Sequence, residues 1–346
     1  MIYYIVCGIL ILFTIADGLK HSPKSSQFTS VFTAVILILF AGLRYETGTD
    51  WFSYTDFYKY GGENIEPGYM LFNDLFRKSN IHYNLFLIFI NTVSLSLVFF
   101  AFRKHAKLVG IAFLLYFCEL YLYFNFSGMR QGLAISITLF SFTYAIDRKF
   151  LNFTICILIA STFHITSLIF FLAYFIPKGR MKLYHYVLLA IFFLSISSAI
   201  YALLNFVSGS LGDKLKFYAE LDTHSENIQS LFVVGIIKRS LILLVLLIFG
   251  KPFFKVENNI YYVNIYLFGF GIYLSTYLIS PDMGVRLGSY FLIFDTIIVG
   301  RLVFANYEIL RRISIICLFS IIALYKIYTY VNMDTYKYHS IFKLNE

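Results

Sequence analysis

The chain has 346 residues, of which 59% are hydrophobic and only 14% are charged. Because a soluble domain carries roughly 25% charged residues, this composition excludes a water-soluble globular protein. A membrane-spanning helix needs about 20 apolar residues, so roughly 10 to 12 helices would use most of the chain. The sequence therefore predicts an all-α polytopic membrane protein, with residues 1–346 forming a single transmembrane domain.

The net charge is basic, with 28 Lys and Arg against 19 Asp and Glu, a formal +9. In a soluble protein this excess would suggest nucleic acid. Here the basic residues cluster in short connections between apolar runs, as they do in cytoplasmic loops of membrane proteins, so we expect no nucleic-acid partner. The cysteines lie in apolar runs without disulfide or zinc spacing, and no phosphate-binding Gly-rich loop is present. The sequence predicts no metal and no cofactor.

Ten apolar runs have the length and composition of membrane helices. The first run lacks the basic start and the small-residue cleavage site of a signal peptide, so we interpret it as a retained helix. Aromatic residues recur at the ends of the runs, as they do at membrane interfaces. The runs cover residues 2–19, 28–43, 83–102, 108–124, 132–146, 183–207, 231–249, 261–279, 287–305 and 313–331.

The short basic connections predict which side of the membrane each loop faces, because Lys and Arg concentrate on the cytoplasmic side. This rule places the N-terminus and two larger loops, at residues 44–81 and 208–230, on the outer side. Loops of this length in a compact protein are usually functional, although ordinary solvated connections have the same composition.

Residues 150–176 break the regular alternation of spans. About 27 residues are too few for two full spans, yet basic clusters flank both ends of the segment. We interpret it as two short helices in a hairpin, whose turn at residues 161–166 stops short of the outer surface. Such a turn must be buried in protein or line a wet cavity. One long tilted helix is the alternative, and it would reverse the side of every later loop.

Lys238 and Arg239 lie inside an apolar run, where each charge costs roughly 2.5 to 3.5 kcal/mol on insertion scales. Snorkelling, or pairing with Glu119 or Asp295 in other helices, would explain them structurally. Adjacent cations on one helix cannot both snorkel in the same direction, so we favour a phosphate site at membrane depth.

Three further arginines are predicted at outer ends of helices. Arg130 begins a helix, so its guanidinium and the N–H groups of the first turn would face the same volume, a ready anion site. Arg44 ends the second helix, and Arg286 follows a Pro-Asp-Met-Gly-Val turn. Each alone would suit an interfacial anchor. Because Arg grips phosphate oxygens with two N–H groups, the set together predicts a diphosphate site.

His164 lies in the predicted hairpin turn beside three hydroxyl side chains. Histidine titrates near neutrality, which suits removal of a proton from a hydroxyl. A lone His is more often structural, and Asp50, Asp56 and Glu66 in the first outer loop are competing bases.

Four short elements stand out in the first half of the chain: residues 42–54 (GLRYETGTDWFSY), 66–69 (EPGY), 127–131 (SGMRQ) and 161–164 (STFH). In this order and spacing they resemble the EpsG family of Wzy-like polysaccharide polymerases. The Arg-x-x-x-Gly-x-Asp and Phe-His elements are distinctive together and weak singly. The second half of the chain carries only generic similarity to the family.

The resemblance implies a GT-C-type glycosyltransferase acting at the outer face of the bacterial plasma or inner membrane. It would join undecaprenyl-diphosphate-linked oligosaccharide repeat units of a capsule, O-antigen or exopolysaccharide, without a nucleotide sugar. Membrane lipid, a chain-length regulator and a flippase of the same pathway would be its partners.

Eight residues receive roles on this basis. The diphosphates would be bound by Arg44, Arg130, Arg239 and Arg286, with Lys238 assisting, while His164 would be the base and Asp50 and Glu66 would position sugars. Direct displacement predicts inversion at the anomeric carbon, whereas a carboxylate nucleophile such as Asp50 or Glu66 would give retention.

Two other functions could use some of the same residues, since a flippase would also want cations in a membrane cavity and an acyltransferase would want a base. A lipid-linked oligosaccharide flippase or transporter tends to have repeated halves and little loop mass, and this sequence has the opposite character. A membrane acyltransferase acting on the glycan could use His164 as its base. It would need a cationic site on the inner side for its acyl donor, and the sequence predicts none there.

Overall fold

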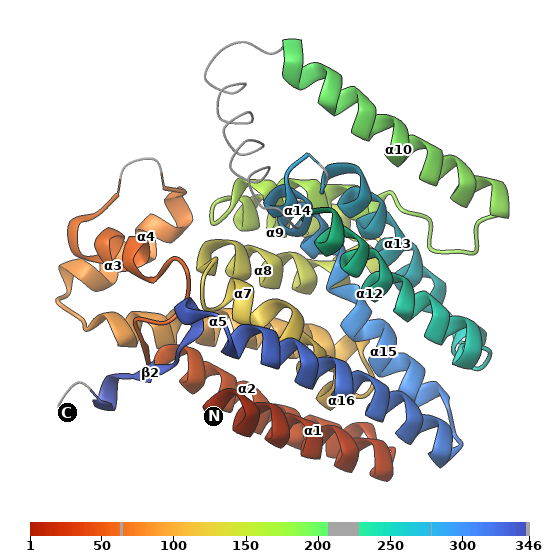
Figure 1. Ribbon diagram of the computed structural model, residues 1–346, viewed down its shortest axis with the longest axis horizontal. Coiled ribbons are helices and arrows are strands. Elements are labelled where there is room, and N and C mark those ends of the chain that lie inside the picture. The colour runs from red at the N-terminus through yellow and green to blue at the C-terminus, as the bar shows by residue number, and fades with distance from the viewer. Residues whose placement is uncertain (63–64, 207–227, 278, 344–346) are drawn as a thin grey trace. The chain divides into compact units, whose positions relative to one another are not determined.

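A computed structural model describes residues 1–62, 65–206, 228–277 and 279–343 (Figure 1). These residues are helical apart from one two-stranded ladder, which confirms the predicted all-α polytopic class. Among them, five helical segments are long and apolar enough to cross a membrane: Ile2–Lys20, Tyr83–His105, Gln229–Phe249, Pro281–Ala305 and Ile309–Val331. Shorter apolar helices account for the other predicted runs.

The chain packs as two compact units. Unit 1 contains Met1–Tyr174 and Thr296–Glu346, and unit 2 contains Phe175–Asp295. The prediction of a single domain stays untested, since this division reflects packing and not independent folding. The predicted site residues of the first half all belong to unit 1, whereas Lys238, Arg239 and Arg286 belong to unit 2.

Helix α8 (Met129–Ile146) is the buried centre of unit 1 and packs against α5 (Tyr83–His105) and α9 (Phe150–Ser161). Small residues on α8 let neighbouring helices approach closely, and Ser136 shares a 2.7 Å hydrogen bond with Ser94 on α5. Helix α5 also packs on α2 (Pro23–Gly42), which begins with proline at its first turn. This packing holds the start of α8 in a fixed place.

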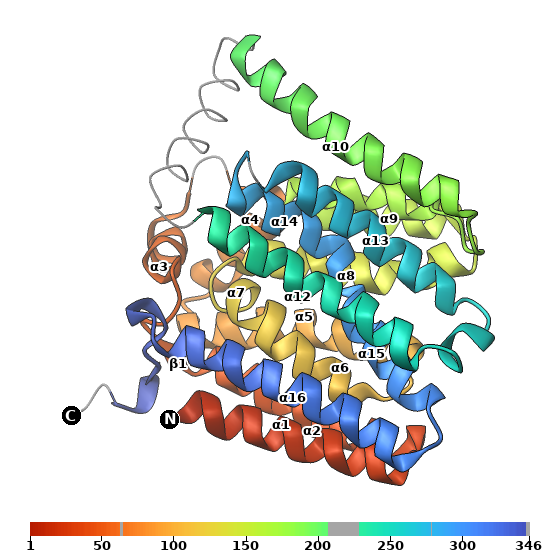
Figure 2. The same ribbon diagram turned by 45° about the vertical axis from the view of Figure 1, so that its right-hand side comes forward.

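The remaining helices of unit 1 include α1 (Ile2–Lys20), which packs on α6 (Val109–Tyr116) and α16 (Ile309–Val331). Figure 2 shows α1, α2 and α16 side by side. The predicted run 108–124 is present but irregular. It continues from α6 into a π-helical turn, η1 (Phe117–Tyr121), and the short α7 (Leu122–Phe124).

The hairpin predicted for residues 150–176 is confirmed, and the single tilted helix is wrong. Helix α9 packs against the 3₁₀-helix η2 (Ile165–Tyr174), and Arg148 and Tyr174 hydrogen-bond to each other's backbone carbonyls where the two ends meet. The arms match in length, because 12 residues of α-helix span about 18 Å and 10 residues of 3₁₀-helix span about 20 Å.

The segment predicted to be the first outer loop contains two helices that its sequence pattern does not predict, α3 (Trp51–Tyr60) and α4 (Pro67–Lys78). Proline begins α4, and the aromatic face of this helix places Phe72 and Phe76 against Phe89 of α5. Neither helix has an apolar run, because aromatic and charged residues share the short sequence. Aromatic packing stabilises them.

The loop is also clamped by a C-terminal segment. Strand β1 (Arg44–Tyr45) pairs antiparallel with β2 (His339–Ser340), which lies between the 3₁₀ turns η4 (Asp334–Tyr336) and η5 (Ile341–Lys343). Backbone N–H groups of Gly48 and Ile341 add bonds to Thr335 and Leu43. The two strands therefore lie on the same side of the membrane.

In unit 2, α13 (Asn259–Thr276) packs against α10 (Leu183–Phe206) and α14 (Pro281–Leu292). Helix α12 (Ile228–Phe249) contacts α13 through Phe232, which stacks near Tyr273 and Tyr277. A short turn, η3 (Phe253–Lys255), joins α12 to α13.

The predicted run 287–305 begins in unit 2 and continues into the part of unit 1 that starts at Thr296. The run 287–305 begins earlier, at Pro281, because Ser280 caps α14 by accepting the N–H of Met283 at 3.3 Å. It then divides at Ile293 into α14 and α15 (Phe294–Ala305). Most of the predicted outer loop 208–230 lies outside the described residues.

Candidate functional site

Arg130 occupies the first turn of α8 and is held from two directions. Its Nη1 forms an ion pair with Glu66, the residue before Pro67 at the start of α4. Its backbone N–H and Nε both donate to the hydroxyl of Tyr54 at 3.4 Å, and the Tyr54 ring lies 5.9 Å from the guanidinium carbon. The Arg130 and Glu66 side chains are 26% and 21% exposed, so a ligand can reach them.

Burial raises the pKa of Tyr54, although the charge and hydrogen bonds of Arg130 oppose the rise. Tyr54 therefore stays a neutral hydroxyl. Since its oxygen accepts from Arg130, its own proton can be donated to a ligand oxygen.

The hairpin turn meets the start of α4 at one tight contact. The N–H of Gly68 donates to the carbonyl of Thr162 at 2.8 Å. A Cβ at Gly68 would lie 2.4 Å from Thr162 Oγ1 and 2.9 Å from its carbonyl oxygen, so no other residue fits this approach. Phe72 and Phe163 stack beside it, with ring centroids 5.8 Å apart.

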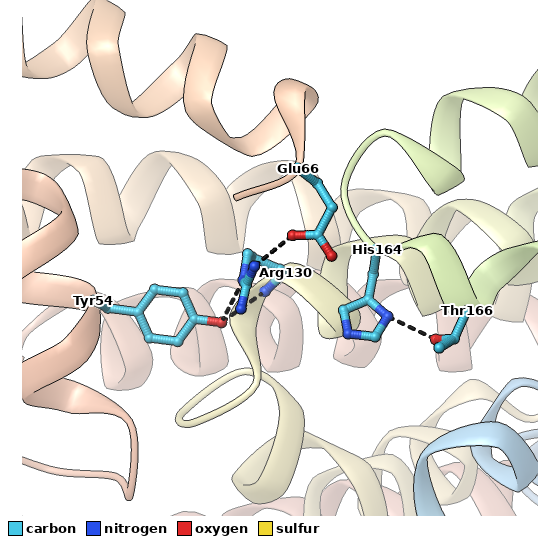
Figure 3. Close-up of polar contacts among 5 residues, drawn as sticks. All are labelled: Tyr54, Glu66, Arg130, His164 and Thr166. Atoms are coloured by element: carbon cyan, nitrogen blue, oxygen red, sulfur yellow. Dashed lines mark hydrogen bonds and ion pairs between the residues drawn. The ribbon is translucent and has the colours of Figure 1, made fainter. Parts of the chain in front are cut away.

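This contact brings His164 beside the ion pair. In Figure 3, Arg130 lies between Tyr54 on one side and Glu66 and His164 on the other. His164 Nδ1 lies 2.6 Å from Thr166 Oγ1. When Nδ1 carries the proton and donates to Thr166, Nε2 keeps the lone pair that a base needs.

Asp50 lies at the start of α3, one helical turn before Tyr54, and accepts a hydrogen bond from Thr49 Oγ1 at 3.0 Å. Its negative charge contributes to the raised pKa of Tyr54. The structure thus places Asp50 near the edge of the cluster formed by Tyr54, Glu66, Arg130 and His164, which we call the Arg130 cluster.

Arg44 has a different setting from the exposed helix end that we expected. It is fully buried, and its guanidinium donates to the backbone carbonyls of Ala41, Thr47 and Phe126. These bonds join the end of α2, the outer loop and the turn before α8. The predicted diphosphate contact of Arg44 stays untested, and in this conformation its N–H groups are used within the protein.

Sequence reasoning missed the residues that frame the Arg130 cluster. Ser127 shares a 3.0 Å hydrogen bond with Tyr336 of the C-terminal segment and accepts the N–H of Thr49 at 3.0 Å. Tyr54 could have been found from its spacing of one helical turn after Asp50. Tyr336 lies far along the chain and gives no comparable pattern.

Unit 2 holds the other predicted cations. The guanidinium of Arg239 lies 3.5 Å over the ring of Tyr273 and donates to the carbonyl of Gly235 at 3.0 Å. A Cβ at Gly235 would lie 2.0 Å from the Tyr273 hydroxyl, so the glycine lets this ring lie close to α12. Within the described part of the chain, no carboxylate forms an ion pair with Arg239.

Arg286 pairs with Asp282 one turn earlier on α14, at 2.6 Å. Both side chains are about one-third exposed, so a stronger anion could compete for the arginine. Lys238 neighbours Arg239 on α12 and is half-buried. The diphosphate roles of these residues stay predictions.

The sidedness of the hairpin turn can be tested by thiol labelling. In a variant whose four native cysteines are replaced, His164→Cys should react with an impermeant maleimide added from outside, because the turn meets the outer loop at Gly68. Lys59→Cys on α3 should also react, and Asp147→Cys at the opposite end of α8 should not. Labelling at Asp147→Cys together with protection at His164→Cys would overturn the predicted orientation.

A family model described as the EpsG family matches residues 27–344. The curated proteins and the solved structures give no match.

Proposed function

Because this chain belongs to the EpsG family of membrane proteins, implicated in exopolysaccharide biosynthesis, we propose that it is the polymerase that joins undecaprenyl-diphosphate-linked repeat units. The observation that supports this most is the Arg130 cluster. It combines a cation suited to a leaving diphosphate with an imidazole suited to an attacking hydroxyl. A flippase needs no such base.

The first chemical demand is the departure of the lipid diphosphate from the anomeric carbon of the donor glycan. As this carbon–oxygen bond breaks, negative charge develops on the diphosphate. Fixed donors aimed at that charge are usually the largest catalytic contribution. Arg130 Nε and Nη1 are bound to Tyr54 and Glu66, while Nη2 bonds to no other described residue. The Nη2 group and the Tyr54 hydroxyl are the donors we assign to the diphosphate.

The second demand is activation of the acceptor, a hydroxyl on the terminal sugar of another lipid-linked unit. His164 Nε2 takes its proton as the oxygen bonds to the anomeric carbon, and Thr166 holds the ring. The Glu66 carboxylate stabilises the imidazolium that forms and orients sugar hydroxyls, and Asp50 contacts sugars at the edge. Direct attack inverts the anomeric carbon, and no metal takes part.

The reaction takes place at the outer face of the bacterial plasma or inner membrane, where the orientation predicted from basic loops puts the Arg130 cluster. A flippase would deliver the units, and a chain-length regulator would set when polymer is released.

Purified protein incubated with lipid-linked repeat units alone tests the proposal. We expect polymer and free lipid diphosphate, also with EDTA present. Translocation in proteoliposomes without bond formation would support a flippase. Product only after addition of an acyl donor would support an acyltransferase. Either result would overturn the polymerase, and a strict metal requirement would overturn the arginine mechanism.

Arg239 provides a separate prediction for unit 2. Arg239→Ala should leave the protein inserted and folded. Polymer formation should fall by about two orders of magnitude, because the diphosphate would lose the paired N–H donors of the guanidinium. Arg239→Lys should recover only part of the activity. Arg311→Ala, which breaks an exposed pair with Glu308, is the matched control and should be near normal. Normal polymer from Arg239→Ala would remove this residue from the site.

A further inference from the structure

Unit 2 contains a partly open cavity of about 450 Å³ between α10 and α13, and Leu194 and Phe254 on its wall are exposed. Its wall is formed by large apolar side chains, among them Phe193 and Leu194 of α10 and Leu267 and Phe270 of α13. Of the residues that line it, only Arg180 is charged. The cavity therefore combines an apolar interior with one cation.

Water is a poor occupant of this space. A buried water needs two to four polar partners, and the only hydroxyl on the wall, that of Tyr186, already donates to Asn264 at 2.9 Å. The exposed face of α10 carries Val187, Leu188 and Ile191, as expected of a helix in contact with hydrocarbon. Since lipid chains are the solvent around α10, a lipid chain is the natural occupant.

The cationic end of the cavity is held in place by the fold. Asn264 of α13 donates to the backbone carbonyls of Pro177 and Gly179 at 2.8 and 3.0 Å, which fixes the segment that ends at Arg180. The Arg180 side chain itself is exposed. A headgroup can reach it while the attached chain enters the cavity.

The length of the cavity fits one leaflet. Its lining on α13 runs from Ile260 to Leu274, about 21 Å at ~1.5 Å per residue. One leaflet contributes about half of the ~30 Å hydrocarbon core, so the cavity suits an acyl chain together with its interfacial end. A polyprenyl carrier is far longer, and its diphosphate would enter from the outer face. Arg180 belongs instead to a short basic connection of the kind that faces the cytoplasm.

We propose that this cavity binds an anionic phospholipid, with one acyl chain between α10 and α13 and the phosphate on Arg180. This site is separate from the Arg130 cluster and does not depend on the polymerase reaction. Arg contacts a phosphate through two N–H groups, and the apolar wall makes the chain contacts.

Native mass spectrometry of the delipidated full-length protein tests this site. Dioleoylphosphatidylglycerol, dioleoylphosphatidylcholine and undecaprenyl phosphate are titrated separately. We expect one phosphatidylglycerol to bind about tenfold more tightly than phosphatidylcholine, since both carry a phosphate but the choline cation of phosphatidylcholine opposes the charge of Arg180. Arg180→Gln should remove that preference without affecting folding, because the side chain is exposed.

Two further variants separate the cavity from the general lipid surface. Ala190→Trp, which fills the cavity from α10, should abolish binding of both phospholipids. Leu188→Trp adds the same side chain on the exposed face of the same helix, and this variant should bind as the wild type does. Equal affinity for both phospholipids, a preference for undecaprenyl phosphate, or full binding by Ala190→Trp would each overturn the proposal.

Discussion

Arg130→Ala should lower polymer formation about 10²- to 10³-fold, the usual cost of removing one donor that stabilises charge in a transition state. The protein should stay inserted and folded, because the Arg130 side chain is partly exposed, at 26%, and lies at the first turn of α8. Arg130→Lys should regain only part of the rate, since an ammonium keeps the charge but cannot bond to Tyr54, Glu66 and a phosphate in one plane. Polymer yield per folded protein is the measurement.

Arg77→Ala is the matched control for this prediction. Arg77 is 28% exposed and pairs with Asp74 on α4 in the same outer segment, so its loss tests the effect of breaking a similar ion pair.

If the Arg130–Glu66 pair were only structural, neutralising both partners with Arg130→Gln and Glu66→Gln should restore activity. We expect the double variant to stay inactive. If the double variant recovered activity, the role of Arg130 would be only structural.

His164→Gln should lower the rate about 10²- to 10⁴-fold, the usual contribution of a general base. In the wild type the rate should fall at acid pH, because the imidazole is then protonated and cannot accept the hydroxyl proton. The residual activity of His164→Gln should not decrease at acid pH in this way. Thr166→Val, which removes the bond to Nδ1, should cause a smaller loss and keep the pH dependence. The pH profile of kcat/KM is the measurement.

Glu66→Gln tests whether Glu66, and not His164, is the base. We expect it to lose activity through the broken ion pair with Arg130 while keeping the fall at acid pH that His164 imposes. His185→Ala, at an exposed position on α10, should behave as the wild type does. A pH profile that changes in Glu66→Gln and not in His164→Gln would make Glu66 the base.

The helices and the hairpin could be predicted because they follow from the lengths of the apolar runs and from the positions of the basic residues. Each apolar run became a helix, and the basic flanks of residues 150–176 correctly required a return to the same side. The β1–β2 pair gives an independent check, since paired strands lie on one side of the membrane. The sequence predicts eight other spans between the two strands, an even number, which agrees with a hairpin at residues 150–176 and not with one more span.

Part of the candidate site could also be predicted. Arg130, Glu66 and His164 were each selected for their chemistry, and the fold brings them together through the contact of Gly68 with Thr162. That contact joins segments almost a hundred residues apart, so no local pattern could predict the geometry.

Arg44 shows why position alone is insufficient. An arginine at the end of an apolar run suits an interfacial anchor or an anion site, and both would be exposed. Its burial depends on the carbonyls of Thr47 and Phe126, which approach only after the outer loop has folded onto the turn before α8. The helices α3 and α4 were missed for a related reason, because tertiary aromatic contacts stabilise them.

The pairing of β1 with β2 sets an order on biosynthesis. Tyr45 leaves the ribosome long before His339, the residue opposite it in the ladder, and all the intervening helices must be inserted before the two strands can meet. Until then the loop that carries Asp50 and Tyr54 lacks the bond from Gly48 to the Thr335 carbonyl, and Ser127, which holds this loop through Thr49, lacks its bond to Tyr336. A nascent chain in which α16 has not yet been inserted therefore lacks the frame that the residues after this helix supply to the Arg130 cluster.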